Sequence, residues 1–274
     1  MIVRFRLRSP FTVICVTHYI TRTYPALALP RVKWIGTSID KAPAERLSGD
    51  VVVKANHGCE MNLFIRAGQY DRADLLRRTR SWITTSYAER EAEWSYGPIV
   101  RRLFIEELLG NASEDLIEIN IRAGGGRLGF GTLLLHAKTP RQSLIYIDRS
   151  RRRVHRKCGK GVRPEELDAI AIPAGYDDAV RFALTMSRGV DYARYDFFWS
   201  GGRLYGGEIT VYPGSGYGLV PEMLEEAIGE TWDIRSSWFM TAPLTGWRAR
   251  YREMLVRYLD AGGLAVGAVS PLSP

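Results

Sequence analysis

The most informative segment of this 274-residue chain is residues 194–216, which read RYDFFWSGGRLYGGEITVYPGSG. Apolar and aromatic residues on both sides of the glycine pair at 201–202 predict two strands joined by a tight hairpin turn. This pairing places Asp196 and Glu208 near opposite positions on one face of the hairpin. Two carboxylates in this arrangement repel each other unless a cation lies between them.

Further polar residues belong to the same predicted face. Arg194 lies two residues before Asp196, and Thr210 lies two residues after Glu208, so all four side chains share one side. Because Mg²⁺ binds carboxylate oxygens together with nucleotide phosphates, the set predicts a metal–nucleotide site. The alternative is a hairpin with exposed charges, which is the more frequent explanation of such an acid pair on its own.

A second segment precedes it in the chain. Residues 51–58 read VVVKANHG and predict a buried strand that ends at Lys54 and passes into a turn. A lysine at the end of an apolar strand needs a partner for its ammonium group. A phosphate group is one such partner, helped by the N–H groups of the turn, and solvent is the commoner alternative.

The two segments, in this order, resemble the ATP-grasp fold. The pattern R-x-D…E-x-T-x-x-P-G is similar to that of D-alanine–D-alanine ligase-type enzymes. The finer patterns V-x-K-x-N-H-G and G-E-I-T-x-Y-P-G-S-G resemble the TupA-like ATP-grasp family, over about residues 33–220. The resemblance implies an α+β fold in which two lobes hold the nucleotide between them, with a shortened N-terminal lobe. Strands and helices that mix without strict alternation favour the same α+β class.

The resemblance implies a division of the chain into four parts. We expect a short N-terminal remnant at 1–48, a small lobe at 49–105, a large lobe with the metal site at 106–235, and a C-terminal helix and tail at 236–274.

The resemblance also implies a role for each matching residue. The catalytic residues are Lys54, at the phosphates, and Arg194, which steadies the reacting carboxylate. The nucleotide-binding residues are Lys54, His57, Gly58, Glu106, Glu107 and Asp115. The metal ligands are Asp196, Glu208 and Thr210.

Together these residues imply an ATP-dependent, ADP-forming ligase that joins a carboxylate to an amine through an acyl phosphate. ATP and Mg²⁺ are its expected cofactors, and small-molecule or glycan carboxylates and amines are its expected substrates. The family resemblance adds a role in cell-surface polysaccharide or teichuronopeptide biosynthesis. Two departures favour a degenerate nucleotide-binding or scaffold protein instead: the loop at 59–62 has no further glycine, and the N-terminal lobe is shortened. A third departure is Ile117, which stands where the family has a lysine.

Charge is unevenly distributed along the chain. The net charge is +8, from 38 basic and 30 acidic residues. Eight of the basic residues and no acid lie between Arg149 and Arg163, so the rest of the chain is balanced. A charge confined to one segment that lacks aromatic residues argues against a nucleic-acid binder. We predict a mobile element that orders over an anionic ligand, with a solvated loop as the alternative.

The remaining composition is typical of a globular protein, with 46% hydrophobic and 25% charged residues. Three widely spaced cysteines predict neither a disulfide framework nor a metal site. The apolar part of the first 20 residues is too short to span a bilayer. We therefore expect a cytoplasmic protein that has no transmembrane segment and is able to associate peripherally with a membrane; the oligomeric state stays open.

Overall fold

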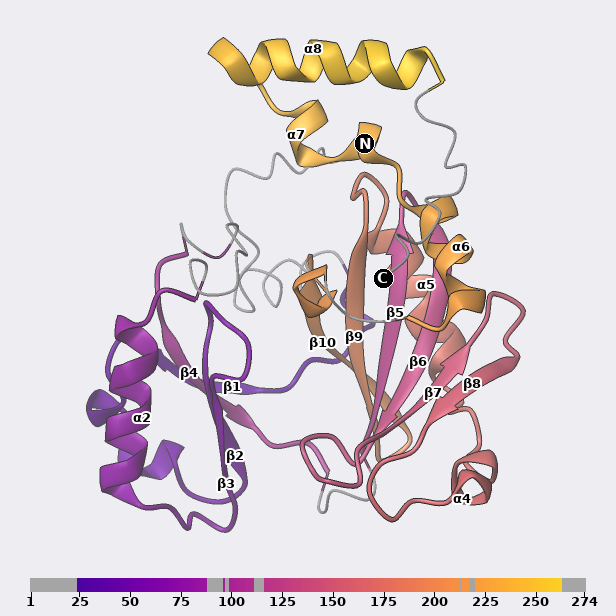
Figure 1. Ribbon diagram of the computed structural model, residues 1–274. Coiled ribbons are helices and arrows are strands. Elements are labelled where there is room, and N and C mark those ends of the chain that lie inside the picture. The colour runs from indigo at the N-terminus through magenta and orange to yellow at the C-terminus, as the bar shows by residue number, and fades with distance from the viewer. Residues whose placement is uncertain are drawn as a thin grey trace, which may run out of the picture.

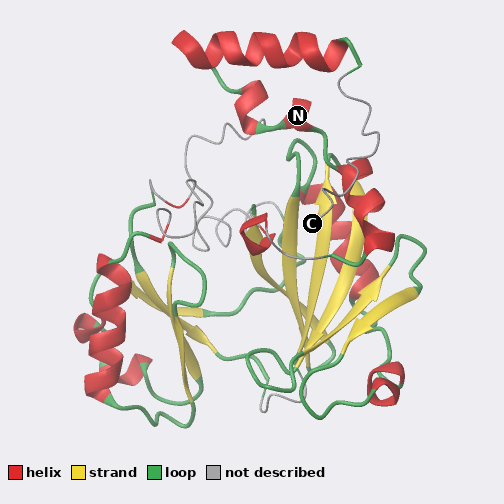
Figure 2. Cartoon of the chain, in the orientation of Figure 1, coloured by secondary structure: helices red, strands yellow, loops and turns green. Residues whose placement is uncertain are grey.

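The computed structural model describes residues 24–87, 96, 99–110, 116–211, 213–216 and 220–262. Two antiparallel sheets form two lobes that lie side by side, with the smaller one on the left in Figure 1. In Figure 2, the strands of both sheets lie toward the middle of the molecule and helix α2 lies on the outside of the small lobe. The mixed architecture confirms the predicted α+β class.

The small lobe is a four-stranded sheet in the order β1-β4-β2-β3. Its strands are β1 (Val32–Gly36), β4 (Leu103–Glu107), β2 (Val51–Ala55) and β3 (Asn62–Ile65). Strand β1 pairs with β4 although it precedes residue 49, where we expected the small lobe to begin. Helix α2 (Arg72–Thr84) starts at Asp71, whose carboxylate accepts hydrogen bonds from the N–H groups of its first turn.

Alternation along β2 and β4 gives the small sheet two different faces. Val51, Val53 and Ile105 are fully buried in a core with Leu75 of α2. The opposite face carries residues of even number, including the charged Lys54 and Glu106. The charged pair Lys54 and Glu106 therefore shares its face with the buried Val52 and Phe104, opposite the core that packs against α2.

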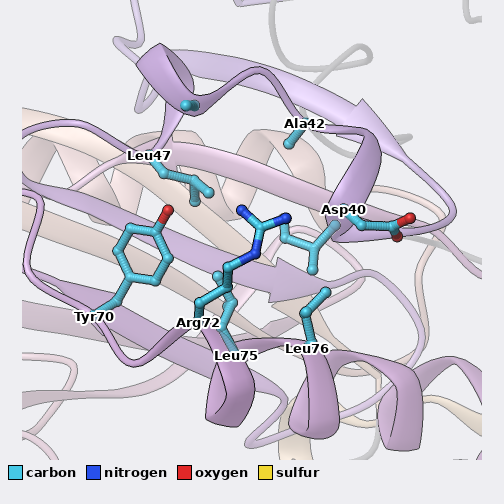
Figure 3. Close-up of a pocket in the computed structure, with 9 residues that line it drawn as sticks. Asp40, Ala42, Leu47, Tyr70, Arg72, Leu75 and Leu76 are labelled. Atoms are coloured by element: carbon cyan, nitrogen blue, oxygen red, sulfur yellow. The ribbon is translucent and has the colours of Figure 1, made fainter.

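A small cavity lies on the helix side of the small lobe, between α2 and the two short 3₁₀ turns η1 (Ile39–Lys41) and η2 (Ala44–Arg46). Figure 3 shows its lining residues, with the Arg72 guanidinium near Leu47 and Tyr70. Because α2 and the buried face of the sheet separate this cavity from the charged face, it is not part of the site described below.

The large lobe is a six-stranded sheet in the order β10-β9-β5-β6-β7-β8. Its strands are β5 (Ile117–Gly124), β6 (Arg127–Leu135), β7 (Ser143–Ile147), β8 (Arg153–Lys157), β9 (Ala193–Ser200) and β10 (Arg203–Thr210). Every neighbouring pair is antiparallel, and the hairpin predicted at 201–202 joins β9 to β10.

Helix α5 (Tyr176–Met186) covers one face of the large sheet, where Ile119, Ile121, Tyr195 and Phe197 form the main core. Helix α6 (Glu222–Thr231) packs on the opposite face and covers only part of it. The remaining helices are α4 (Pro164–Asp168), α7 (Trp238–Thr241) and α8 (Gly246–Asp260), and α8 is drawn apart from both sheets at the top of Figure 1. The uncovered part of this face is where the polar residues of β5, β9 and β10 gather.

The basic segment is an ordered part of this sheet, so the prediction of a mobile element there is wrong. Its second half includes β8, which pairs with β7. Arg149 hydrogen-bonds the Leu128 and Ala227 carbonyls, and Arg153 hydrogen-bonds carbonyls at the end of α4. Four further arginines form ion pairs with nearby acids: Arg151, Arg152, Arg156 and Arg163. The sequence count missed these partners because every one of those acids lies outside the segment.

Among the described helices, none combines the length and apolar character that crossing a membrane requires.

Candidate functional site

The predicted acids of the β9–β10 hairpin lie in one hydrogen-bonded network. Arg194 donates two hydrogen bonds to Asp196, from Nε to Oδ1 and from Nη2 to Oδ2, both 2.7 Å long. The Thr210 hydroxyl accepts from Arg194 at 3.2 Å and donates to Glu208 Oε1 at 3.0 Å. The prediction that these four side chains share one face is confirmed.

A β-bulge makes this shared face possible. With Ser200 opposite Arg203, an unbroken ladder would place Gly207, not Glu208, opposite Asp196. The register shifts between Gly206 and Ile209, so that one extra residue turns Glu208 toward the site while Ile209 still packs on the core. A Cβ on Gly207 would come within 2.8 Å of the Asp196 carbonyl oxygen, so the bulge needs glycine there.

The structure brings two further charged residues to this network that the sequence did not reveal. Glu118 lies on the same face of β5, two residues from Asn120, which is the partner of Asp196 across the strands. Burial, followed by the Asp196 charge, raises the pKa of Glu118 to about 7. Burial and the adjacent Asp196 also raise the pKa of Glu208. Burial is the larger cause of both shifts, and the neighbouring carboxylate adds to it.

Lys138 is the second missed residue, in the loop after β6. Its ammonium lies 5.2 Å from the centre of the Phe64 ring on β3, so it connects the two lobes. Burial and the nearby Lys54 lower the pKa of Lys138. Only six residues of the chain are lysine, and that scarcity was the signal that could have drawn attention to it.

Lys54 forms an ion pair with Glu106, whose side chain is 9% exposed. Because the Lys54 and Lys138 ammonium groups repel each other, an anion between them would stabilise both.

The turn after Lys54 is fixed to the rest of the small lobe. The buried Asn56 side chain bonds the Val100 carbonyl and the Arg102 N–H group. His57 donates from Nε2 to the Trp82 carbonyl at 2.8 Å, and burial lowers the pKa of the ring. The prediction assigned His57 to the nucleotide, but its imidazole is 2% exposed and attached to α2. It acts as an anchor for the turn.

Gly58 is packed closely, since a Cβ there would lie 2.8 Å from the Tyr87 ring. The turn continues toward the large lobe, where Glu208 contributes to a raised pKa at Cys59 after the larger effect of burial. The Cys59 thiol is therefore close enough to Glu208 for its charge to act on it.

Of the remaining predicted residues, Glu107 is not brought to the centre of the site. The Glu107 carboxylate accepts a hydrogen bond from the Arg31 N–H group at 2.8 Å and so supports the chain that enters β1. Asp115 lies outside the described residues.

The donor set is suited to Mg²⁺ that is shared with a nucleotide. No group of three or more His, Cys, Asp or Glu residues within the described part of the chain converges as a closed metal site. Mg²⁺ is usually held by one or two carboxylates, with phosphates and water completing its ligands. Asp196 and Glu208, with Thr210 beside them, fit this requirement, because a bound cation would offset the repulsion between the two carboxylates.

Comparison with solved structures gives several ligases. The chain is 17% identical to a D-alanine–D-alanine ligase from Bacillus anthracis complexed with ATP, covering 88% of this chain and 67% of that one, with a TM-score of 0.44. It is 12% identical to the Helicobacter pylori D-alanine–D-alanine ligase, covering 82% of this chain and 61% of that one, with a TM-score of 0.47. It is 15% identical to an L-amino acid ligase from Bacillus licheniformis, covering 75% of this chain and 41% of that one, with a TM-score of 0.41. No curated protein matches the sequence.

The family comparison covers most of the chain. Residues 32–232 match the model of the TupA-like ATP-grasp family, and this range contains both sheets and the whole acidic network. The chain therefore belongs to the TupA-like ATP-grasp family, as its sequence patterns predicted.

Proposed function

We propose that the protein is an ATP-dependent, ADP-forming carboxylate–amine ligase. One observation carries the proposal: two lysines from different lobes lie close enough to a group of three carboxylates, Glu118, Asp196 and Glu208, for their charges to act on one another. Cations for phosphate beside acids for a divalent metal are what phosphoryl transfer from a nucleotide requires.

Each group has a role in this proposal. Lys54 and Lys138 bind the phosphates of ATP, and Asp196, Glu208 and Thr210 face the metal. Bound Mg²⁺ would supply neutralisation of the phosphate charge. Arg194 then orients the carboxylate that is to be activated.

The proposed reaction has two steps. A carboxylate oxygen attacks the γ-phosphorus of ATP, the bond to the β-phosphate oxygen breaks, and ADP and an acyl phosphate form. An amine then attacks the acyl carbon, phosphate leaves with the bonding electrons, and the nitrogen loses a proton to give an amide. Positioning and charge neutralisation carry both steps, so no nucleophilic side chain is needed.

A role in cell-surface polysaccharide or teichuronopeptide biosynthesis, with small-molecule or glycan substrates, completes the proposal. It is supported by the family resemblance alone. We also propose a cytoplasmic location.

The alternative is a nucleotide-binding or scaffold protein without turnover. The turn that follows Gly58 favours it, because Cys59, Glu60 and Met61 offer side chains where glycines would let phosphates approach. Glu60 also adopts a positive φ of 60°, which is unfavourable for a residue with a side chain.

Trapping the acyl phosphate separates the two functions. The protein is incubated with Mg-ATP, a panel of carboxylic acids, and hydroxylamine, which converts an acyl phosphate into a hydroxamate. The ligase proposal expects ADP and hydroxamate in equal amounts, only when an acid is present, and loss of both in Asp196→Asn. ATP binding without ADP or hydroxamate across the panel would favour the scaffold alternative.

A further inference from the structure

The polar face of β5 extends beyond the acidic network. Glu118, Asn120 and Arg122 alternate along this face, and about 13 Å separates the first from the third at the usual rise per residue. Glu118 lies at the end near Lys138, and Asn120 lies opposite Asp196. Arg122 is therefore on the far side of the proposed metal position from the lysine pair.

Arg122 lies directly beside another arginine. The strand register pairs it with Arg194 across β5 and β9, so that both guanidinium groups are on the site face. Burial lowers the pKa of Arg122, and the Arg194 charge lowers it further. Arg194 donates hydrogen bonds from Nε and Nη2 to the two carboxylate oxygens of Asp196. That carboxylate is therefore already paired with Arg194 and is not a partner for Arg122.

Within the described part of the chain, no carboxylate forms an ion pair with Arg122, although the charge of the nearby Asp196 acts on it. Its guanidinium lies over the Phe130 ring, 4.6 Å from the ring centre, and the Tyr192 hydroxyl lies beside it. Its Nη1 atom is buried and has no hydrogen-bond partner among the described residues. Stacking on Phe130 satisfies the flat face of the guanidinium and Tyr192 forms a hydrogen bond with the side chain, whereas Nη1 still requires an acceptor.

Arg194 pairs with Asp196 and lies 3.8 Å from Glu208, whereas Nη1 of the adjacent Arg122 is buried without a partner among the described residues. A buried charged donor of this kind favours the binding of an additional anion. The planar fork of an arginine matches a carboxylate or a phosphate group, to which it donates two parallel hydrogen bonds. Because an arginine is not deprotonated in proteins, neutralisation by loss of its proton is not available.

We propose that Arg122 binds a second anionic group on the carboxylate substrate. The substrate is then a dicarboxylic acid, or a carboxylic acid that bears a phosphate, with its reacting carboxylate at Arg194 and its second anion at Arg122. The inference depends on the proposed ligase function for the identity of the reacting group, but binding of the dianion does not depend on turnover.

Binding of matched acids to the purified full-length chain tests the proposal. Succinate and butyrate have four carbons each, and glutarate and valerate have five, so each pair differs by one anionic group. Calorimetric titration measures their affinities for the wild type, Arg122→Gln, Arg122→Lys and the control Arg127→Gln. Arg127 is a suitable control because it is exposed at the start of β6.

We expect at least one dicarboxylate to bind about 10–100-fold more tightly than its matched monocarboxylate, the range for a hydrogen bond to a charged group. Arg122→Gln should abolish this preference, Arg122→Lys should retain part of it, and Arg127→Gln should keep all of it. If Arg122→Gln does not fold, the lysine variant replaces it, because it keeps the charge but loses the fork.

A wild type without preference in either pair would overturn the proposal, and so would a preference that survives in both Arg122 variants. Failure of the ligase function is recognised separately. A dicarboxylate preference that depends on Arg122, without ADP release from any acid, would refute the ligase and leave the anion site standing. ADP release with a Michaelis constant that is unchanged by Arg122→Gln would refute the anion site alone.

Discussion

Replacing Lys54 with methionine tests whether this lysine serves the nucleotide or only the fold. The substitution keeps most of the side-chain length and removes the charge. It also leaves Glu106 without its ion-pair partner, on a side chain that is 9% exposed. A fall in ATP binding by this variant alone would therefore have two explanations.

The structure bounds the cost of losing the pair. Breaking a buried ion pair costs about 3–5 kcal/mol, and an exposed pair contributes about 0–1 kcal/mol. Because the Lys54 side chain is 27% exposed, we expect an intermediate loss of about 2 kcal/mol. For a chain of this size that lowers the melting temperature by about 4–8 °C.

The double variant Lys54→Met/Glu106→Gln separates the two explanations. It removes both charges, so its stability should return to within about 1 kcal/mol of the wild type. Its ATP affinity should stay about 10–100-fold low, because the phosphates still lack a charged donor. Adenosine, which has no phosphate, should bind all variants similarly. Thermal denaturation and calorimetric titration with ATP and adenosine measure these quantities.

Recovery of ATP affinity in the double variant would refute the phosphate role of Lys54, since the loss would then follow folding. An unchanged melting temperature in the single variant would show that the ion pair does not stabilise the fold.

Four further predictions concern the large lobe. Asp196→Asn should weaken nucleotide binding about tenfold in Mg²⁺ and leave it nearly unchanged in EDTA, whereas equal loss in both would exclude a metal role. Gly207→Ala should destabilise the protein by about 1–3 kcal/mol in chemical denaturation, because the added Cβ would contact the Asp196 backbone. The control Gly229→Ala should be neutral or stabilising, because Gly229 lies in helix α6 and an added Cβ would meet no atom within 4 Å. Because the folded state raises the pKa of Glu118 to about 7, stability in EDTA should fall as pH rises from about 4.5 to 7, and Glu118→Gln should flatten this decline in melting curves. Arg153→Gln should lower the melting temperature, because it removes hydrogen bonds to the carbonyls at the end of α4. ATP should not change the rate at which a protease cuts the wild type at β8, and protection by ATP would contradict an ordered strand there.

The local pattern of the sequence was sufficient for the elements that carry the site. The hairpin at 201–202 and the strand that carries Lys54 both occur where turn residues and apolar runs predicted them. These features depend on neighbours within a few residues, so the chain itself contains the information.

Long-range partners could not be predicted in this way. Lys138 and Glu118 join the site through the pairing of distant strands and the approach of two lobes, and no local pattern marks either one. His57 was misassigned because its carbonyl partner lies 25 residues away on α2. The arginines of the basic segment were misjudged for the same reason, since charge counts along a chain do not show which acids fold next to them.

The bulge in β10 has a consequence for comparing relatives by motif spacing. Asp196 and Glu208 are twelve positions apart, one more than facing residues in a regular hairpin with this turn. The extra position is the result of the β-bulge, which requires glycine at position 207. In a relative whose two acids are eleven positions apart, the glycine before the second acid should no longer be required, and a single-residue deletion in this hairpin should be tolerated only at the bulge.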